Sequence, residues 1–256
     1  MRRADELREA VEAYLGALTF APQLGALDEA LRYPLEAGGK RIRPVLCVAV
    51  AEAAGGSADD ALPAAAALEL VHTFSLVHDD LPALDDDDER RGRPSAHIAF
   101  GEGVALLAGD ALLAESFRLA LSYDTNEVAR ELADAALGMI AGQYRDITGD
   151  DSDLEAVHRL KTGRLFVAAV RIGLAIAGTA SVEREPWLAF GEEVGLLFQV
   201  VDDLLDGDGY AERLGVDGAE SLARESATRA HAQLARIAAD TSVLGDLVDV
   251  LAVRTA

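Results

Sequence analysis

Residues 61–85 read ALPAAAALELVHTFSLVHDDLPALD, an apolar stretch that ends in a group of carboxylates. Alanine and leucine dominate the stretch, and both favour helix over strand. Charged groups are costly to leave near a core unless something compensates them. We therefore predict a buried helix over residues 61–81, whose carboxyl end presents Asp79, Asp80 and Asp85 for a chemical purpose.

A second acidic cluster closes another apolar segment, residues 184–205. Asp202 and Asp206 are one helical turn apart, so both carboxylates reach the same side of a helix, and Asp203 lies beside them. Magnesium takes such oxygen ligands together with water and substrate phosphate oxygens. The two clusters predict a site that holds a diphosphate-like ligand through Mg²⁺. For either cluster alone, a solvated helix end is the alternative.

The remainder of the chain repeats the helical pattern without a convincing alternating strand. The first amphipathic segment runs from Leu7 to Leu18, with charged residues on its other face. Similar patterns cover residues 24–37, 41–54, 103–122, 127–144, 154–178 and 219–253. Glycine and proline mark short breaks between them. We predict an all-α protein, in which residues 1–256 form one domain built as a single large bundle of about ten or more helices.

Composition excludes several classes of partner. The formal net charge of −22 repels nucleic acid and anionic lipid, so we expect neither as a partner. The most apolar stretch in the later part of the chain, residues 165–177, contains Arg171 and is too short to span a bilayer, which takes about 20 residues. The amino terminus lacks the apolar stretch of a signal peptide, so the expected location is the cytoplasm.

Basic residues near the acidic clusters indicate an anion site. The segment GGKRIRP, residues 38–44, places Lys40 and Arg43 on one face where a helix opens, and His72 lies two turns before Asp79. Further cations follow at Arg90, Arg91 and Lys161. Each of these alone is more often a surface or core side chain. Together with the two acidic clusters they predict one pocket for two phosphorylated groups.

The order of these motifs resembles that of the short-chain isoprenyl diphosphate synthases, the farnesyl and geranylgeranyl diphosphate synthases. The matching segments are GGKRIRP at 38–44, DDLPALD at 79–85, RRGRP at 90–94, KTG at 161–163 and FQVVDDLLD at 198–206. The resemblance covers most of the chain. It implies the isoprenoid synthase fold, with helices around a central cavity, and a homodimer that packs through helices within residues 103–144.

The resemblance also implies the reaction: an allylic diphosphate, dimethylallyl or geranyl, ionises, isopentenyl diphosphate attacks the carbocation, and a proton is lost. Several Mg²⁺ ions per active site would be held by Asp79, Asp80, Asp85, Asp202, Asp203 and Asp206. The expected catalytic residues are Asp79, Asp80, Asp85, Lys161, Asp202 and Asp203. Allylic substrate contacts are expected from Arg90, Lys161, Thr162 and Gln199, and isopentenyl diphosphate contacts from Gly39, Lys40, Arg43, His72 and Arg91.

Product length is implied by the residues just before the first acidic motif. Phe74 lies five residues before Asp79, where in this family a bulky side chain closes the floor of the tail pocket, and Ser75 follows it. This favours farnesyl diphosphate, a fifteen-carbon all-trans product. The twenty-carbon geranylgeranyl diphosphate is the alternative.

One departure and three other functions stay open. Family members carry a lysine after the second acidic motif, but this chain has none after Lys161, which leaves Arg213 or Arg224 as substitutes. A terpene cyclase normally begins its second metal motif with asparagine, and Asn126 is the only asparagine here. A noncatalytic helical partner subunit would lose a metal cluster, and a phosphohydrolase would need more clustered histidines than these five.

Overall fold

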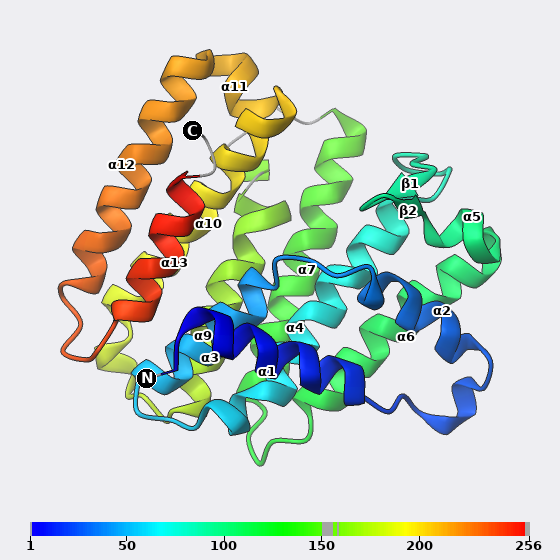
Figure 1. Ribbon diagram of the computed structural model, residues 1–256, viewed down its shortest axis with the longest axis horizontal. Coiled ribbons are helices and arrows are strands. Elements are labelled where there is room, and N and C mark those ends of the chain that lie inside the picture. The colour runs from blue at the N-terminus through cyan, green and yellow to red at the C-terminus, as the bar shows by residue number, and fades with distance from the viewer. Residues whose placement is uncertain (1, 150–155, 158, 254–256) are drawn as a thin grey trace.

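A computed structural model describes residues 2–149, 156, 157 and 159–253, and almost all of its regular structure is helical (Figure 1). The prediction of an all-α protein is therefore confirmed. In chain order the helices are α1 (Ala4–Ala17), the 3₁₀ turn η1 (Pro22–Leu24), α2 (Leu27–Glu36), α3 (Ile42–Ala53), α4 (Ala58–Asp79), α5 (Ala96–Phe100), α6 (Glu102–Ala120), α7 (Glu127–Thr148), the π-helix η2 (Arg159–Gly163), α9 (Arg164–Ile176), η3 (Ser181–Glu183), α10 (Glu185–Asp206), α11 (Gly209–Leu214), α12 (Val216–Leu234) and α13 (Ser242–Ala252).

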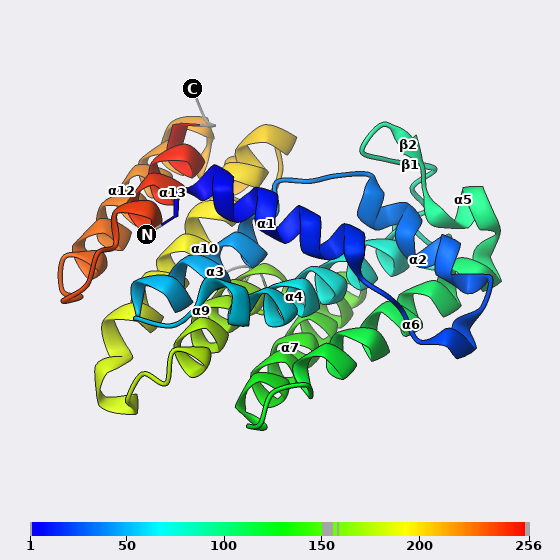
Figure 2. The same ribbon diagram turned by 60° about the horizontal axis from the view of Figure 1, so that its bottom comes forward.

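Helix α4 lies at the centre, packed by α3 and α6, with α1 crossing it (Figure 2). It begins at Ser57, whose hydroxyl accepts a hydrogen bond from the Asp60 amide. Pro63 lies inside the helix, where the Tyr123 hydroxyl accepts from the Ala64 amide and donates to the Asp60 carbonyl. The tyrosine thereby satisfies main-chain groups around the proline.

Helix α10 organises the other half of the molecule. It packs against α9 and α12, and α13 lies beside α12 at one edge (Figure 1). The buried hydrophobic core is continuous from Leu7 in α1 to Leu251 in α13. This continuity supports a single domain, which stays a prediction.

Helix α4 is also the one described helix that is long and apolar enough to cross a membrane, by length and composition alone. Of its most apolar window, 67% is buried inside the protein, as in the central helix of many globular folds. The feature is therefore explained by the core.

Several details differ from the sequence predictions. Residues 219–253 form two helices, because α12 ends at Leu234 and the Asp240 carboxylate accepts the Ser242 amide before α13 begins. A short antiparallel hairpin, β1 (Glu89–Arg90) with β2 (Arg93–Pro94), was not expected. Its turn needs positive φ at Arg91 and Gly92, and two-residue strands are too short to show alternation.

The predicted helix over residues 154–178 is only partly within the described chain. Residues 154, 155 and 158 lie outside the described residues. From residue 159 the chain forms the π-helix η2 and then α9, which ends at Ile176. The short helices α5 and α11 were not predicted, since five or six residues carry too little periodicity.

Candidate active site

Both acidic clusters face one cavity of about 1560 Å³. Asp79 and Asp85 line it from the end of α4, and Asp202 and Asp203 line it from the end of α10. The β1–β2 hairpin and α11 also contribute lining residues, and both lie along the upper edge of the view in Figure 1. The cavity therefore brings together the ends of two helices that are more than one hundred residues apart in sequence.

The first cluster is shaped by a turn after α4. The Asp85 amide donates to the Asp79 carbonyl at 2.8 Å, so the five residues between them fold back on the helix end. Burial raises the pKa of Asp79 to about 6, with Lys161 opposing the shift and Asp85 adding to it. A carboxylate that is dehydrated and close to another carboxylate favours a bound cation.

Asp80 points away from this cavity and into an ion pair. Its side chain is only 3% exposed, and Arg90 donates from Nε to Asp80 Oδ1 at 2.7 Å. Arg90 Nη2 also contacts Asp87 Oδ2 at 3.0 Å. Burial raises the pKa of Asp80, and the bond from Arg90 opposes that shift. Asp80 thus connects the helix end to the hairpin.

In the second cluster, Asp202 is a carboxylate that borders the cavity. Burial raises the pKa of Asp202, and Lys40 across the cavity opposes the shift. Asp203 instead accepts from Gln199 Nε2 at 2.5 Å and from the Tyr210 amide at 2.8 Å, which ties α10 to α11. Among the described residues, Asp206 and Asp80 are the two predicted metal ligands that do not line the cavity.

Cationic side chains also line the cavity. Lys40, Arg43, His72 and Arg91 all border it, together with Gly39. The Arg43 guanidinium lies 4.6 Å from the centre of the Phe166 ring and 5.1 Å from that of Phe198. Burial lowers the pKa of Arg43 to about 10, and within the described chain its Nε has no hydrogen-bond partner. The pKa of His72 is lowered well below its usual value by burial and then by Arg43, so the ring is neutral near pH 7.

The π-helix η2 places Lys161 and Thr162 in the same cavity. Lys161 Nζ donates to Asp146 Oδ2 on α7 at 2.5 Å. Two glycines make room for η2: a Cβ on Gly142 would lie 2.6 Å from the Lys161 amide nitrogen, and one on Gly195 would lie 3.2 Å from Gly163 Cα. Single π-turns of this kind recur at functional sites.

The structure therefore gathers most of the predicted site. The predicted residues that line the cavity are Gly39, Lys40, Arg43, His72, Phe74, Ser75, Asp79, Asp85, Arg90, Arg91, Lys161, Thr162, Gln199, Asp202 and Asp203. Of the two proposed replacements for the absent lysine, Arg213 lines the cavity, whereas Arg224 pairs with Glu220 on α12.

Sequence reasoning assigned no role to Gln143 and Asp146, which also line the cavity from α7. Both Gln143 side-chain polar atoms are buried without a hydrogen-bond partner in the described chain. The signal was present: the two residues are three apart, which places them on one face of a helix.

Magnesium fits the donor set. The groups that face the cavity from the two helix ends are carboxylates, and the raised pKa values of Asp79 and Asp202 mark negative charge that is dehydrated and incompletely neutralised. Within the described residues, no group of three or more histidine, cysteine or acidic side chains is poised to hold a metal ion unaided. An ion shared by one or two carboxylates, water and a substrate phosphate matches this arrangement.

Comparisons with known proteins agree with the geometry. The sequence profile of the polyprenyl synthetase family matches residues 25–244. A geranylgeranyl diphosphate synthase of Cyanophora paradoxa is 42% identical over 215 residues, which cover 78% of this chain and 72% of that protein. A farnesyl diphosphate synthase of Bacillus subtilis is 41% identical over 205 residues, covering 74% of this chain and 69% of that protein. The crystal structure of a geranyltransferase from Legionella pneumophila superposes with a TM-score of 0.89 at 32% identity, over 98% of this chain and 96% of that one.

The helical bundle and the cavity between its two aspartate-bearing helix ends define an isoprenoid synthase fold, and the protein is an enzyme of the prenyltransferase class. The chain belongs to the polyprenyl synthetase family.

Proposed function

We propose that the enzyme condenses isopentenyl diphosphate with dimethylallyl or geranyl diphosphate to give a short-chain all-trans prenyl diphosphate. The observation that carries this proposal is that one cavity is lined by carboxylates together with Lys161 and also by Lys40, Arg43 and Arg91. We assign the first set to an acidic half of the cavity and the second set to a cationic half. Two diphosphates could thus bind side by side, one through metal ions and one through cationic side chains.

The acidic half would take the allylic diphosphate. Asp79, Asp85 and Asp202 would hold Mg²⁺ there, with Asp80, Asp203 and Asp206 also predicted as ligands. Several bound ions would neutralise the charge that develops on the leaving diphosphate. Lys161, Thr162, Gln199 and Arg90 would contact the same substrate, and Lys161 is already oriented by its bond to Asp146.

The cationic half would take isopentenyl diphosphate without metal ions. Lys40, Arg43 and Arg91 would neutralise its diphosphate, while His72 is uncharged and serves as a hydrogen-bond partner. Holding both substrates in fixed orientation converts an encounter in solution into a reaction within one complex.

In the condensation, the carbon–oxygen bond of the allylic substrate breaks, and the diphosphate leaves with the electron pair. The double bond of isopentenyl diphosphate then attacks the allylic cation. A proton is lost from the resulting cation, and the departed diphosphate is the acceptor that we propose. The apolar lining, which includes Phe74, Met139 and Leu165, would exclude water that otherwise traps the cation as an alcohol.

Farnesyl diphosphate is the product that we propose. Phe74 is 7% exposed and lines the cavity, with its ring 5.0 Å from the His78 ring in an edge-to-face arrangement. A ring held in this way, with Ser75 beside it, would stop the growing chain at fifteen carbons. Geranylgeranyl diphosphate is the alternative product, and relatives of both kinds are similar to this chain.

A direct assay tests the proposal. Purified protein with Mg²⁺, radiolabelled isopentenyl diphosphate and allylic diphosphates of increasing length should yield a fifteen-carbon product, separated by chain length after dephosphorylation. A terpene cyclase would instead release a cyclic hydrocarbon from the allylic substrate alone. A noncatalytic subunit would give no product at any substrate combination.

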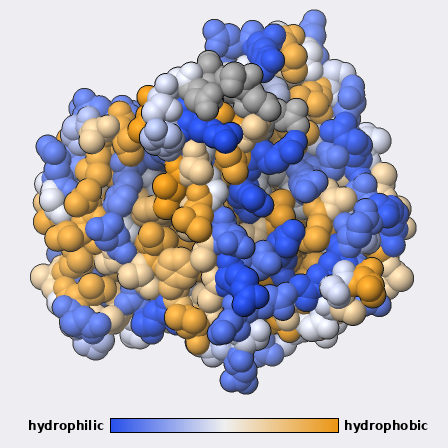
Figure 3. Space-filling view, turned by 180° about the vertical axis from the view of Figure 1, so that it is seen from behind, coloured by the Kyte–Doolittle hydropathy of each residue, from blue (hydrophilic) through white to orange (hydrophobic). Residues whose placement is uncertain are grey.

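We also propose that a second copy of this chain covers an exposed apolar face. Figure 3 shows apolar side chains gathered on the side of the molecule where Figure 1 places α6 and α7. Exposed apolar residues on these two helices that do not line the cavity are Val104, Leu106 and Leu107 on α6, and Leu137 on α7. Patches of this kind mark protein interfaces. Leu137→Glu should convert a dimer to a monomer in light scattering, whereas Val182→Glu, at an 88% exposed site outside this face, should not.

The proposed location is the cytoplasm. Leu7, Val11 and Leu15 of α1 are buried in the core, so this segment is a structural part of the fold. Fractionation of the native host, with the protein followed by antibody, tests the location.

A further inference from the structure

Arg41, at the start of α3, has an unusual backbone and a buried charge. Its φ and ψ are 48° and 33°, in the left-handed region that non-glycine residues seldom occupy, and it is 3% exposed. Such a conformation persists only where the surroundings hold it in place. The contacts of the Arg41 side chain therefore need to restrain this backbone conformation.

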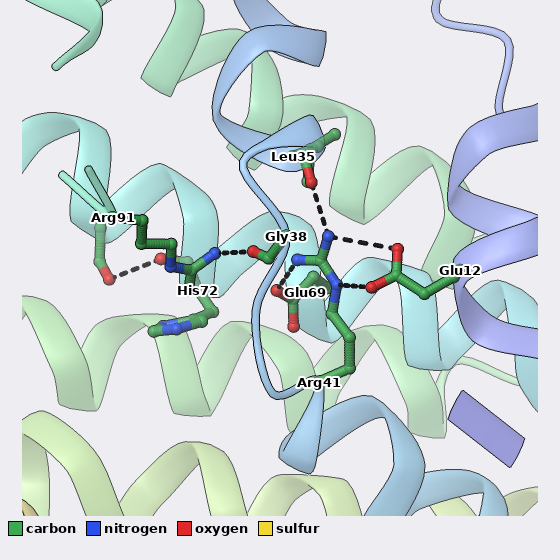
Figure 4. Close-up of polar contacts among 8 residues, drawn as sticks. Glu12, Leu35, Gly38, Arg41, Glu69, His72 and Arg91 are labelled. Carbon is green, nitrogen blue, oxygen red and sulfur yellow. Dashed lines mark hydrogen bonds and ion pairs between the residues drawn. The ribbon is translucent and has the colours of Figure 1, made fainter. Parts of the chain in front are cut away.

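The guanidinium binds three separate elements (Figure 4). Nε donates to Glu12 Oε1 of α1 at 2.9 Å, and Nη1 donates to Glu69 Oε1 of α4 at 2.5 Å. Nη2 donates to the Leu35 carbonyl at the end of α2 at 2.6 Å. Although Arg41 borders the cavity, its donors are engaged by protein groups, so the side chain acts as a cross-link.

This cross-link closes the loop that carries Gly38, Gly39 and Lys40. The Leu35 carbonyl lies at one end of the loop, and the Arg41 carbonyl accepts the Val45 amide at the other, where α3 begins. From the hairpin side, Arg91 donates to the Gly38 carbonyl. The approach is close enough that a Cβ on Gly39 would lie 2.8 Å from Arg91 Nη1.

Glu69 explains why several cationic side chains can lie close together near the start of α3. It is 2% exposed and attracts Arg41, Arg43 and Arg91 alike. Three guanidinium groups against the carboxylates of Glu12 and Glu69 leave one net positive charge, to which Lys40 adds. An anionic side chain would repel a diphosphate directly, so Glu69 favours binding only by keeping the arginines together and in place.

We propose that Arg41 and Glu69 are positioning residues for isopentenyl diphosphate: they hold the Gly38–Lys40 loop in the shape that presents Gly39, Lys40 and Arg43 to that substrate. This inference rests on the proposed function. We expect it to act mainly on one substrate, because the loop carries Gly39 and Lys40 of the cationic half that we assigned, whereas Asp79 and Asp202 lie at the ends of α4 and α10. Loss of the cross-link should therefore weaken one substrate selectively.

Steady-state kinetics with each substrate varied in turn tests this. In Arg41→Lys the charge remains but the forked guanidinium is lost, and in Glu69→Gln the shape remains but the charge is lost. For both we expect the KM for isopentenyl diphosphate to rise about ten-fold or more, with kcat and the allylic KM changed by less than about three-fold. Calorimetric titration should show a rise of similar size in the Kd for isopentenyl diphosphate.

Arg32→Lys is the matched control. Arg32 also forks between a carboxylate and a main-chain carbonyl, with Nε 2.6 Å from Asp28 Oδ2 and Nη2 2.8 Å from the Leu18 carbonyl, and it does not line the cavity in the described chain. Its loss should lower the melting temperature and leave both KM values unchanged.

The outcomes are distinct. Suppose that the wild-type enzyme is active and that each variant changes both KM values equally or leaves both unchanged. That result overturns the positioning role and leaves the proposed function intact. If Arg41→Lys does not fold, Glu69→Gln decides the matter alone. Wild-type protein that forms no product overturns the proposed function, and the calorimetric comparison of wild type with the variants then judges the role of the loop.

Discussion

Arg90 is bonded to Asp80 through Nε at 2.7 Å, and this contact takes one of the three aspartates of the first motif out of the cavity. The same guanidinium reaches Asp87, so it ties the end of α4 to the chain that leads into the hairpin. Two neighbouring aspartates thus have different surroundings: Asp79 lines the cavity, and Asp80 holds in place a cation, Arg90, that also lines it.

Asp80→Asn and Asp79→Asn should therefore have different effects on metal dependence. Asp80→Asn removes a charged hydrogen-bond partner of Arg90, which should lower the free energy of unfolding by about 2 kcal/mol and reduce turnover. Asp79→Asn should raise the Mg²⁺ concentration needed for half-maximal activity by more than Asp80→Asn does. Magnesium titrations of both variants check this. An equal shift in the two variants would show that Asp80 binds metal directly.

The pKa of Asp79 predicts a cost of ionisation in the metal-free protein. Burial raises that pKa from 3.8 to about 6, so the folded state binds the proton more tightly than the unfolded state. The stability that the protonated group provides is complete below about pH 4 and is lost as the pH rises through about 6. Asp79→Asn should therefore stabilise the protein in EDTA at about pH 7.5, by on the order of 1–2 kcal/mol, while lowering activity at a fixed Mg²⁺ concentration.

Thermal melts at several pH values measure this difference. The gain should shrink to nothing near pH 4, where wild-type Asp79 is itself protonated. Asp88→Asn, in the exposed part of the same acidic run, is the control and should show no such pH-dependent gain. A variant that is equally destabilised at every pH would contradict the buried, uncompensated state of Asp79.

The sequence predicted the fold class and much of the cavity because the strongest signals coincide with helix ends. The apolar run before Asp79 and that before Asp202 each specify a buried helix. A carboxylate at the end of such a helix is costly unless a cation or hydrogen bonds compensate it, so it indicates a functional site. The separate environments of Asp79, Asp80 and Asp203 could not be predicted, because they depend on contacts with Arg90, Gln199 and the Tyr210 amide. Those contacts arise from turns, whose geometry single-residue patterns specify poorly.

The Arg41 cross-link could not be predicted from the sequence for a related reason. In the sequence Arg41 is one cation among several in a basic segment, and Glu12 and Glu69 are charged residues on two other helices. Only packing shows that these three meet in the interior. Residues with helical periodicity are predictable from their own segment, whereas a buried ion pair between segments requires the tertiary arrangement.

Phe74 should control product length. Phe74→Ala removes most of a ring that borders the cavity, so the growing chain should extend by about one five-carbon unit, from fifteen to twenty carbons. The fold should tolerate the change at a cost of about 3 kcal/mol or less, since the ring already faces a cavity. Ser75→Ala alters the same wall by a single atom and should leave the product unchanged. Chromatography of the dephosphorylated products checks both variants, and an unaltered profile in Phe74→Ala would remove Phe74 from the floor of the tail pocket.

Gly142→Ala should disable the enzyme through Lys161. The added methyl group would lie 2.6 Å from the Lys161 amide nitrogen and 2.8 Å from its Cα, so the π-helix η2 must shift away from α7. The shift would break the bond between Lys161 and Asp146 and withdraw the ammonium group from the allylic half of the cavity. We expect kcat/KM for the allylic diphosphate to fall by about ten-fold or more, because a displacement near 1 Å at a catalytic group costs up to about a hundred-fold.

Gly16→Ala is the matched control. Gly16 also lies in a helix, and nothing lies within 4 Å of the added Cβ. Alanine there should stabilise the protein by up to about 1 kcal/mol without a kinetic effect. If Gly142→Ala retains wild-type kcat/KM, then the close approach of η2 to α7 does not set the position of Lys161.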